Sequence, residues 1–503
     1  MSDTQDLLSS LQRRGIRLWV NDGRLHFNAP KGALSAEELN QLRAQREQLI
    51  DSLEYGELRR GTPSSTRPRE SLLPLTALQM RRWKYLVASA SGLSERTCLV
   101  AQQVSGQLNV ELLRRSLQHL VHRHEALRSR IVLLNGVPHQ TVDAEREIPW
   151  QVIRLPATDA TNPLAGLAQL VERFVREKSD LRAGSAIAAR LFSVSPQEHA
   201  LVVALDHMFA DAVSCQVIAR ELWSVYHALL RQLPTPLPTL TLQFPDYVAW
   251  MHRTHRSWMK AHAEYWLTRL TNLPAMTLPG TAPSEREAPI SQTVTFEFDG
   301  HLTAWLRNFA RRERTLLPLA TMAIYVASLA RWLRQRDFLV AFVSNARDRP
   351  ELQSMVGFLA DYLHLRVAVE PPDSFVELAK RIDQEFRRAY EHQDYGRVPD
   401  LIPVCLPELG FNWVPGTLEQ LPVEVATGSA DILTVQPLQL QLAFPLLPPR
   451  KLSVQFLESD VAIMASVAYR PDVLSAAAVE CFVDGMRQLA YRIMENPDAP
   501  IYP

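Results

Sequence analysis

The sequence has little cysteine and shows no pattern that would put it to use. Its 503 residues include four cysteines, at the widely separated positions Cys98, Cys215, Cys405 and Cys481. Their spacing fits neither a metal site nor a disulfide framework. Disulfides are rare in reducing compartments, so the sequence predicts a cytoplasmic location.

The sequence also lacks an excess of charge and a long hydrophobic run. Lys and Arg together number 54, as do Asp and Glu, which gives no support to a nucleic-acid or membrane-surface role. No stretch is apolar for long enough to span a bilayer, and the first residues do not resemble a signal peptide. With 47% hydrophobic residues, the chain has material for more than one core.

Residues 1–55 are expected to form a small α+β domain of their own. Two runs of alternating character, Ile16–Val20 and Arg24–Asn28, flank Asn21-Asp22-Gly23, which is a strong hairpin signal. Ser35 to Glu38 indicates a capping box that opens a helix. A domain of about 50 residues suits binding better than catalysis, although it could also be a decoration packed on the main body.

This N-terminal segment resembles a known docking module. The run from Gly15 to Leu25, followed by Ala29-Pro30 and Leu34-Ser35, is similar to the β-hairpin docking domains of tubulysin-type assembly lines. The resemblance implies capture of a short C-terminal peptide of an upstream carrier protein, and a hairpin edge suits an added peptide strand. Basic side chains would attract acidic peptide residues, or they could simply be solvated. The docking candidates are Arg17, Trp19, Arg24 and Lys31.

The remainder of the chain is predicted to be a linker and two lobes. Residues 56–70 have little apolar content and are punctuated by Pro, Ser, Thr and Gly, which is typical of a linker. Strand and helix patterns then alternate twice, with a break near residue 275. This favours an α/β fold with two lobes of similar size, 71–275 and 276–503, and a cleft between them.

The strongest candidate site lies between Leu201 and Ser214. Five apolar residues predict a buried strand, and residues 213–230 predict an amphipathic helix. Asp206, His207 and Asp211 lie on the tight connection between them, where a rigid scaffold can aim side chains into a cleft. By itself, a histidine in this position would more often be a hydrogen-bonded core residue than a catalyst.

Seven segments of the main body, in order, resemble the condensation domain of nonribosomal peptide synthetases over roughly residues 71–503. The segments are Leu73–Gln79, Arg123–Arg128, Asp206–Ala212 with Ser214, Asp246–Trp250 with Tyr265-Trp266, Arg347–Leu352, Val356–Arg366 and Asn496–Ile501. The resemblance implies two chloramphenicol-acetyltransferase-like lobes in a V-shaped pseudo-dimer. It also implies a donor acyl group carried as a thioester on the phosphopantetheine of a partner carrier protein, with no cofactor bound by the chain itself. The acceptor nucleophile would enter from the opposite end of a tunnel.

The resemblance assigns roles to individual residues. His207 would be catalytic, either removing a proton from the nucleophile or orienting it and stabilising the tetrahedral species. Asp211 matches the acid that pairs with an arginine to hold the loop in shape, and Arg347 is the matching partner, so both would be structural. Ser214 is expected to cap the helix that follows.

The sequence departs from the family motif His-His-x-x-x-Asp-Gly at two positions. Asp206 replaces the first histidine and Ala212 replaces the glycine, while Asp361 replaces a family asparagine farther along. Asp206 could be a second carboxylate that raises the basicity of His207, or it could point away and serve the backbone. The departures keep open a non-catalytic recruiting domain.

The predicted function is transfer of an acyl chain from an upstream carrier protein to an amine or alcohol, forming an amide or ester. A docking module in front and no adenylation or carrier segment behind favour a free-standing, chain-releasing enzyme similar to those of enacyloxin-type assembly lines. The sequence could also be a piece of a longer synthetase, with a carrier-bound acceptor. The alternatives are the recruiting domain and an ester-forming acyltransferase that uses acyl-coenzyme A.

Overall fold

The computed structural model describes most of the chain. The described ranges are 16–21, 24–28, 72–88, 96–155, 167–273, 291–393, 408–415, 423–426, 432–438 and 450–501, except positions 178, 185 and 348, together with a few positions in 42–49 and 276–279. The predicted linker, 56–70, lies outside these residues.

The predicted N-terminal hairpin is confirmed. Strands β1 (Arg17–Asn21) and β2 (Arg24–Asn28) pair antiparallel, with Asn21 opposite Arg24. Buried apolar side chains come from the hairpin and from the segment after it: Ile16, Leu18, Leu42 and Leu49. The side chains of Arg17, Trp19 and Arg24, and all of Lys31, lie outside the described residues, so their docking role stays a prediction.

The first lobe is built on a six-stranded sheet with β9 (Glu198–Leu205) near its centre. The strand order is β14-β15-β4-β9-β8-β7, with β4 at Cys98–Ser105, β8 at Ile187–Ser193 and β7 at Trp150–Arg154. Helices α5 (Val110–Arg123) and α7 (Ala212–Leu230) share a core with Leu201, Val203 and Leu205. Helix α6 (Leu167–Val175) shares another core with Ala200, Val202 and Ala204. Because both faces of β9 are covered, its residues 200–205 form a continuous apolar run.

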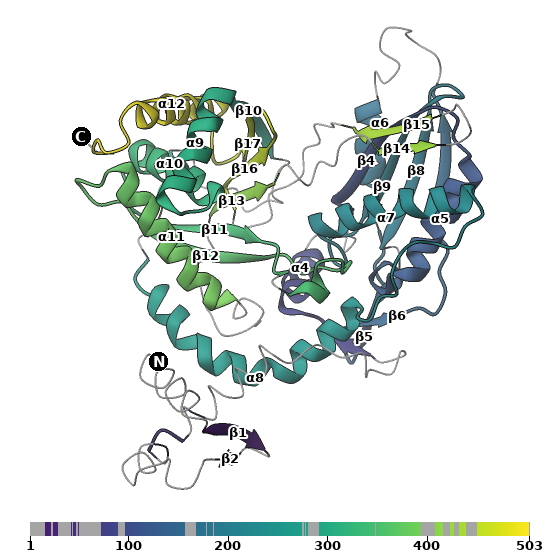
Figure 1. Ribbon diagram of the computed structural model, residues 1–503, viewed down its shortest axis with the longest axis horizontal. Coiled ribbons are helices and arrows are strands. Elements are labelled where there is room, and N and C mark those ends of the chain that lie inside the picture. Colours follow the sequence, from purple (N-terminus) through teal and green to yellow (C-terminus); the bar gives the residue numbers. More distant parts are fainter. Residues whose placement is uncertain are drawn as a thin grey trace.

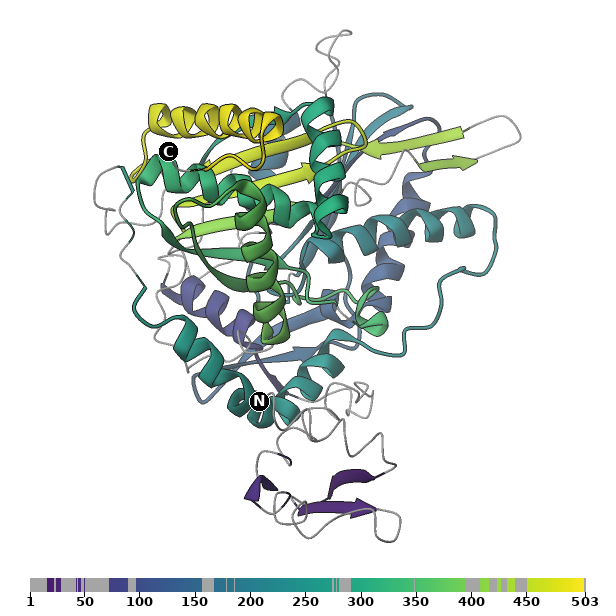
Figure 2. The same cartoon turned by 60° about the vertical axis from the view of Figure 1, so that its left-hand side comes forward.

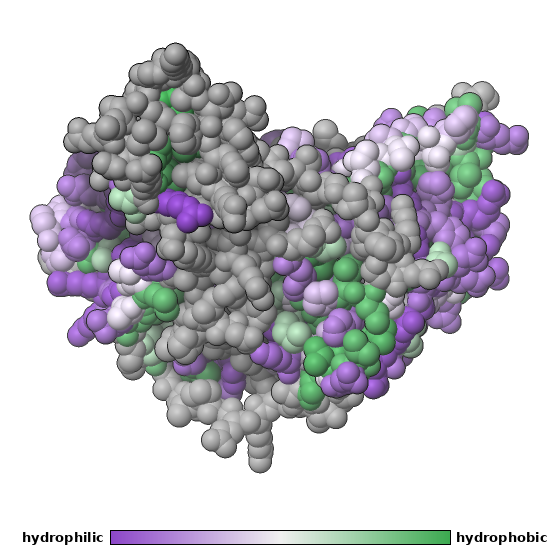
Figure 3. Space-filling view, turned by 90° about the horizontal axis from the view of Figure 1, so that it is seen from below, coloured by the Kyte–Doolittle hydropathy of each residue, from purple (hydrophilic) through white to green (hydrophobic). Residues whose placement is uncertain are grey.

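A smaller sheet and a helix complete this lobe. Strand β3 (Leu73–Pro74) pairs with β6 (Val137–Val142), which pairs with β5 (Ser129–Leu134), and helix α4 (Ala77–Ala88) follows β3. Seen from below, apolar side chains gather on one part of the surface, on the right-hand lobe (Figure 3).

The second lobe has its own six-stranded sheet, in the order β10-β17-β16-β13-β11-β12. The strands are β10 (Gln292–Phe298), β11 (Asp337–Ser344), β12 (Asp361–Ala368), β13 (Leu409–Val414), β16 (Leu452–Glu458) and β17 (Ile463–Tyr469). The helices are α9 (Gly300–Glu313), α10 (Leu317–Leu333), α11 (Phe375–Glu391) and α12 (Ala476–Glu495). Helix α10 is buried at every position from Leu319 to Ala330, so it is the central helix of this core.

The two lobes stand side by side, and two elements connect them (Figures 1 and 2). Helix α8 (Phe244–Arg269) runs along their base and contributes Trp250 to the first core and Trp266 to the second. These tryptophans are therefore core residues, one in each lobe.

The second connection is a hairpin from beyond the predicted boundary at residue 275. Strands β14 (Val423–Ala426) and β15 (Ile432–Pro437) come from the second half of the chain but join the sheet of the first lobe, where Thr434 pairs with Ser105 of β4. No single position in the sequence therefore divides the chain into the two sheets. The hairpin also covers an edge of the first sheet that β4 would otherwise expose.

Within the described part of the chain, no single helix is long and apolar enough to cross a membrane. Helices α9 and α10 meet that test only as a bent pair, with an angle of 109° between them.

Candidate active site

The predicted strand-to-helix connection is confirmed, and it places His207 at the end of the buried strand β9. The strand ends at Leu205, and the backbone turns back through a hydrogen bond from the Phe209 amide to the Asp206 carbonyl. Helix α7 then begins at Ala212. The covered strand and the long helix hold this connection at both ends.

The imidazole of His207 is held in one orientation by the backbone. Its Nδ1 lies 2.8 Å from the carbonyl oxygen of Ala210. A carbonyl oxygen can only accept, so in the neutral ring Nδ1 carries the hydrogen and Nε2 carries the lone pair. The ring of Phe358, from the second half of the chain, lies 4.6 Å away at 53°. The structure therefore presents Nε2 as the basic atom.

The buried surroundings of His207 decide its charge. The pKa of His207 is raised above its ordinary value: burial and Arg82 lower it, but Cys98 and the Asp211 carboxylate raise it. The pKa of Cys98 is itself raised well above the usual thiol range, by a hydrogen bond to Cys215 and by burial. A raised pKa makes the imidazole a stronger base, which suits removal of a proton from an acceptor.

The predicted pair of Asp211 and Arg347 is present and ties the two halves of the chain together. Arg347 Nη1 lies 2.8 Å from Asp211 Oδ2, and Nη2 lies 2.9 Å from Oδ1. The backbone amides of Leu359 and Ala360 also donate to Oδ2, each at 3.0 Å. Both side chains are almost fully buried. We call this arrangement the latch, defined by Asp211, Arg347 and the segment 355–360.

Ser214 extends the latch, although not as the helix cap that the sequence predicted. The N-cap of α7 is Asp211, which accepts from the Ser214 amide, while the Ser214 hydroxyl stands in the third position of a capping box. The amide of Gly357 donates to the Ser214 hydroxyl oxygen at 3.0 Å. A Cβ at Gly357 would lie 2.3 Å from the ring of Phe244, so only glycine fits at this crossing.

Asp206 serves the backbone and the arginines on its own lobe, and this favours the second of the two roles left open by the sequence. Its Oδ1 accepts from the Met208 amide at 2.9 Å and lies 3.9 Å from Arg82 Nε. Burial lowers the pKa of Arg96, and the charge of Asp206 acts in the raising direction. The carboxylate is fully buried, so it stabilises the connection after β9.

Replacing Asp206 with asparagine is therefore expected to destabilise the chain by about 1–3 kcal/mol, because it removes a buried charge that faces arginines. The pH profile of turnover should stay where it is. Thermal unfolding and rate against pH measure the two effects. Asp143→Asn is a matched control, since Asp143 also pairs with two arginines, Arg130 and Arg146. A shift of the profile in Asp206→Asn alone would restore the tuning role.

Two residues at this site were not singled out from the sequence. Gln79 Nε2 donates to the carbonyl oxygen of Met208 at 2.9 Å and holds the residue after His207. The Cys98 thiol lies 3.6 Å from the Ala210 carbonyl, which also accepts from His207. Gln79 belongs to the segment Leu73–Gln79 that carried part of the resemblance, whereas no pattern marked Cys98.

The segment Arg123–Arg128 contributes to structure and not to the site. His124 Nε2 lies 2.8 Å from Glu221 Oε2 of α7, and Arg123 Nε donates to the same oxygen at 3.0 Å. The Glu125 amide donates to Gln243 at the start of α8. These contacts fix α5, α7 and α8 around the core.

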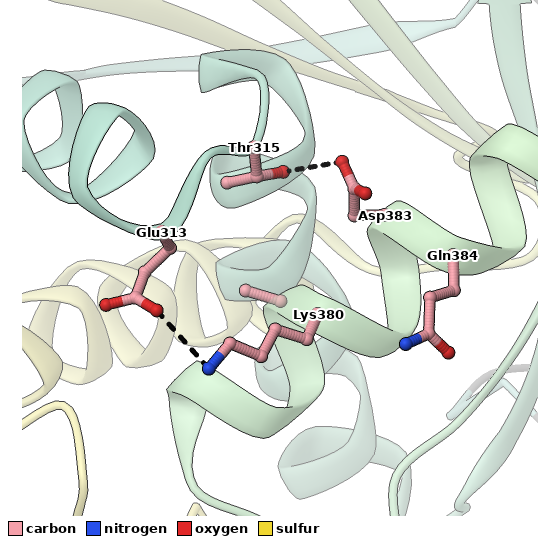
Figure 4. Close-up of a pocket in the computed structure, with 6 residues that line it drawn as sticks. Glu313, Thr315, Lys380, Asp383 and Gln384 are labelled. Atoms are coloured by element: carbon pink, nitrogen blue, oxygen red, sulfur yellow. Dashed lines mark hydrogen bonds and ion pairs between the residues drawn. The ribbon is translucent and has the colours of Figure 1, made fainter.

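A second group of polar residues forms a small pocket in the second lobe (Figure 4). It lies between the end of α9 and α11, where Lys380 pairs with Glu313 at 3.4 Å and Thr315 donates to Asp383 at 3.1 Å. These charged groups are paired with one another, so the pocket is a weaker candidate for an acid, a base or a nucleophile than the site of His207. Among the described residues, no cluster of His, Cys, Asp or Glu could hold a metal ion.

The strand-turn-helix with His207, latched to the other half of the chain, can be compared with known proteins. The family model described as "Condensation domain" matches residues 69–399, which is more than half of the chain. The chain belongs to the condensation domain family. The family model described as "TubC N-terminal docking domain" matches residues 5–54. Condensation domains catalyse acyl transfer that forms amide or ester bonds, and they work with carrier proteins in assembly lines.

Relatives of this condensation domain are very large synthetases. It is 28% identical over 475 residues to a probable non-canonical nonribosomal peptide synthetase, CymA, of Salinispora arenicola, covering 90% of this chain and 6% of that protein. It is 27% identical over 379 residues to malpinin synthetase of Mortierella alpina, covering 73% and 5%. The chain thus spans only about a twentieth of the length of these relatives.

Solved structures confirm the two-lobed condensation fold. The X-domain from teicoplanin biosynthesis superposes with a TM-score of 0.73 at 20% identity, covering 88% of this chain and 98% of that one. The condensation domain of chain release from the enacyloxin polyketide synthase has a TM-score of 0.67 at 22% identity, covering 98% and 95%.

Proposed function

We propose that this condensation domain transfers an acyl group from the phosphopantetheine thioester of an upstream carrier protein to an amine or alcohol. This transfer would release the acyl group from the carrier protein. The observation that carries the proposal is the orientation of His207. Its Nδ1 is committed to the Ala210 carbonyl, which leaves Nε2 as the base.

The reaction follows from the chemistry of a thioester and a neutral imidazole. The acceptor nitrogen or oxygen attacks the thioester carbonyl carbon while Nε2 accepts its proton. The tetrahedral species collapses, the carbon–sulfur bond breaks, and the sulfur takes the proton from the imidazolium to become the free thiol. The result is an amide or ester and an unloaded carrier. The hydrogen bond from Nδ1 to the Ala210 carbonyl holds the ring in one orientation through both steps.

Two comparisons support the finer parts of this proposal. The docking model over residues 5–54 supports a carrier protein as the upstream partner. The enacyloxin structure, which is described as mediating chain release, is covered over 95% of its length and covers 98% of this chain. These likenesses favour a small free acceptor over a carrier-bound one. The phosphopantetheine belongs to the carrier protein and not to this chain.

The rival function is a recruiting domain without catalysis. It is favoured by the likeness to the teicoplanin X-domain, which was also solved in complex with OxyB, and by Asp206 and Ala212 in the motif. The two functions differ in whether the acyl group leaves the carrier.

A panel experiment tests the proposed function. Acyl-loaded carrier is incubated with the full chain and a set of small amines and alcohols, and products are identified by mass spectrometry. We expect an amide or ester with at least one acceptor and a matching amount of unloaded carrier. A carrier that keeps its acyl group with every acceptor, while still binding the chain, would support the recruiter instead.

Deleting residues 1–60 is expected to raise the KM for the loaded carrier by about tenfold or more and to leave kcat unchanged, because the docking contact supplies effective concentration and not chemistry. Steady-state kinetics measure both values. The matched control is a carrier without its C-terminal peptide, which should show the same rise with the full chain and no further rise with the deletion. Equal turnover from acyl-coenzyme A, insensitive to the deletion, would favour the coenzyme A-dependent alternative.

A further inference from the structure

Two arginines from different lobes converge on one aromatic ring near the latch. Arg81 belongs to α4 of the first lobe, and its guanidinium carbon lies 5.9 Å from the ring centroid of Tyr362. Arg450 precedes β16 of the second lobe, and its guanidinium carbon lies 4.0 Å from the same centroid. Figure 1 shows α4 beside the end of β12, the strand that carries Tyr362.

Only one acidic group is paired with these two cations within the described part of the chain. Asp361 Oδ1 lies 3.5 Å from Arg81 Nη2 and also accepts from the Tyr362 amide. No ion pair joins Arg450 to a described acidic side chain, and its Nε is buried without a hydrogen-bond partner among the described residues. Buried polar donors are nearly always satisfied in proteins, so this donor is an exception that a bound acceptor would account for. The balance is one uncompensated positive charge.

A neighbouring histidine is close enough to both arginines to be influenced by their charges. Burial, together with Arg81 and Arg450, lowers the pKa of His364 to about 3. His364 is therefore neutral at ordinary pH and adds no charge of its own. Both guanidinium groups thus influence the same face of β12, on which Tyr362 and His364 alternate with buried residues.

The cluster is connected to the residues around His207 through both lobes. On the first lobe, Arg81 directly precedes Arg82, which lies 3.9 Å from the carboxylate next to His207. On the second, Asp361 follows by three residues Phe358, whose ring contacts His207. Three residues span at most about 10 Å, so the Cα atoms of Asp361 and Phe358 lie no farther apart than that.

We propose that Arg81, Arg450 and Tyr362 form a subsite for a carboxylate on the acceptor, so that the acceptor class is a small amine or alcohol bearing an anionic group. A single carboxylate matches the single uncompensated charge. Guanidinium groups bind carboxylates through paired N–H donors, and stacking of Arg450 on Tyr362 holds its donors in place. The role of this subsite rests on the proposed function, but binding of the carboxylate can be measured without turnover.

The test compares 4-aminobutanoate with 4-aminobutanamide, which share the amine and differ in the anionic group. Calorimetric titration of the full chain should show about tenfold or tighter binding of the carboxylate. Arg450→Gln should remove that preference, and Arg450→Lys should keep part of it. Arg487→Gln, at an exposed arginine of α12, is the control and should change nothing. The double variant Arg81→Gln with Asp361→Asn removes the first cation without leaving a buried carboxylate alone.

Each outcome of this test decides the proposal. The same preference in wild type and Arg450→Gln, or no preference in wild type, overturns it. Loss of binding to free phosphopantetheine in Arg450→Gln, with the amine pair unaffected, also overturns it and assigns the site to the phosphate of the donor arm. A preference that follows Arg450 in a protein that never unloads a carrier would sustain the subsite and refute the proposed function. Thermal unfolding of each variant shows whether the binding data come from folded protein.

Discussion

Arg347→Ala is expected to lower the stability of the chain by about 3–5 kcal/mol, because it leaves the Asp211 carboxylate buried without its cation. Asp211 lies at the start of α7, and Arg347 and the amides of Leu359 and Ala360 come from the other half. The loss should therefore also separate the lobes around His207 and lower turnover. Thermal unfolding of the purified variant measures the first effect.

The exposed pair of Arg387 and Asp383 is the matched control for the latch. Its atoms lie 2.6 Å apart, closer than those of the latch, but the arginine is 64% exposed. Exposed pairs are worth about 0–1 kcal/mol, so Arg387→Ala should leave the unfolding midpoint nearly unchanged. Equal losses of stability in the two variants would show that the buried Arg347–Asp211 pair contributes no more than an exposed one.

Acidification should weaken the latch with a definite sign. Burial acts to raise the pKa of Asp211, but the charge and hydrogen bonds of Arg347 and the backbone amides hold it below its usual range. A carboxyl with a depressed pKa in the folded state stabilises the fold above its unfolded pKa, near 3.9. That stability is lost as the pH falls from that value through the lower folded value. The difference in stability between wild type and Arg347→Ala should shrink over the same range.

His207→Ala is expected to lower the rate of acyl transfer by about 10²–10⁴-fold, which is the usual contribution of a general base. The side chain is partly buried and makes one hydrogen bond to the backbone, so folding should be much less affected than in Arg347→Ala. Single-turnover rates with saturating acceptor measure the loss. In wild type, the rate should rise with pH as the imidazolium loses its proton, and this limb should be absent from the residual rate of the variant.

His207→Gln separates the two roles that the sequence left open for this residue. Glutamine can still orient an acceptor through a hydrogen bond, but it cannot take its proton. A rate that stays near wild type in His207→Gln would favour orientation over proton removal. A rate as low as that of His207→Ala is the result that a general base predicts.

The sequence predicted the structure best where a local pattern of residue types determines it. The apolar run before Asp206 predicted the buried strand, and the resemblance to condensation domains implied the pairing of Asp211 with Arg347. The hairpin at 17–28 followed from alternating residues around Asn-Asp-Gly. In each case the interactions that determine the structure join residues close in the sequence, or the residues belong to a motif of several segments.

The sequence was least informative where distant segments meet. Nothing in residues 423–437 indicates that they complete the sheet of the first lobe, because their alternation suits either sheet equally. No pattern around Cys98 indicates that its thiol lies beside the Ala210 carbonyl. Arg81 and Arg450 are 369 positions apart (450 minus 81), and only the fold brings both to Tyr362.

The most direct test of the account is the mass of a loaded carrier protein after one turnover. An upstream carrier bearing an acyl-phosphopantetheine thioester is mixed with an excess of the full chain and a small acceptor, and its intact mass is followed over time. The account predicts loss of the acyl mass with wild type, appearance of the acyl-acceptor product, and retention of the acyl mass with His207→Ala. Equal unloading by wild type and His207→Ala, or no unloading by a wild type that binds the carrier, would contradict it.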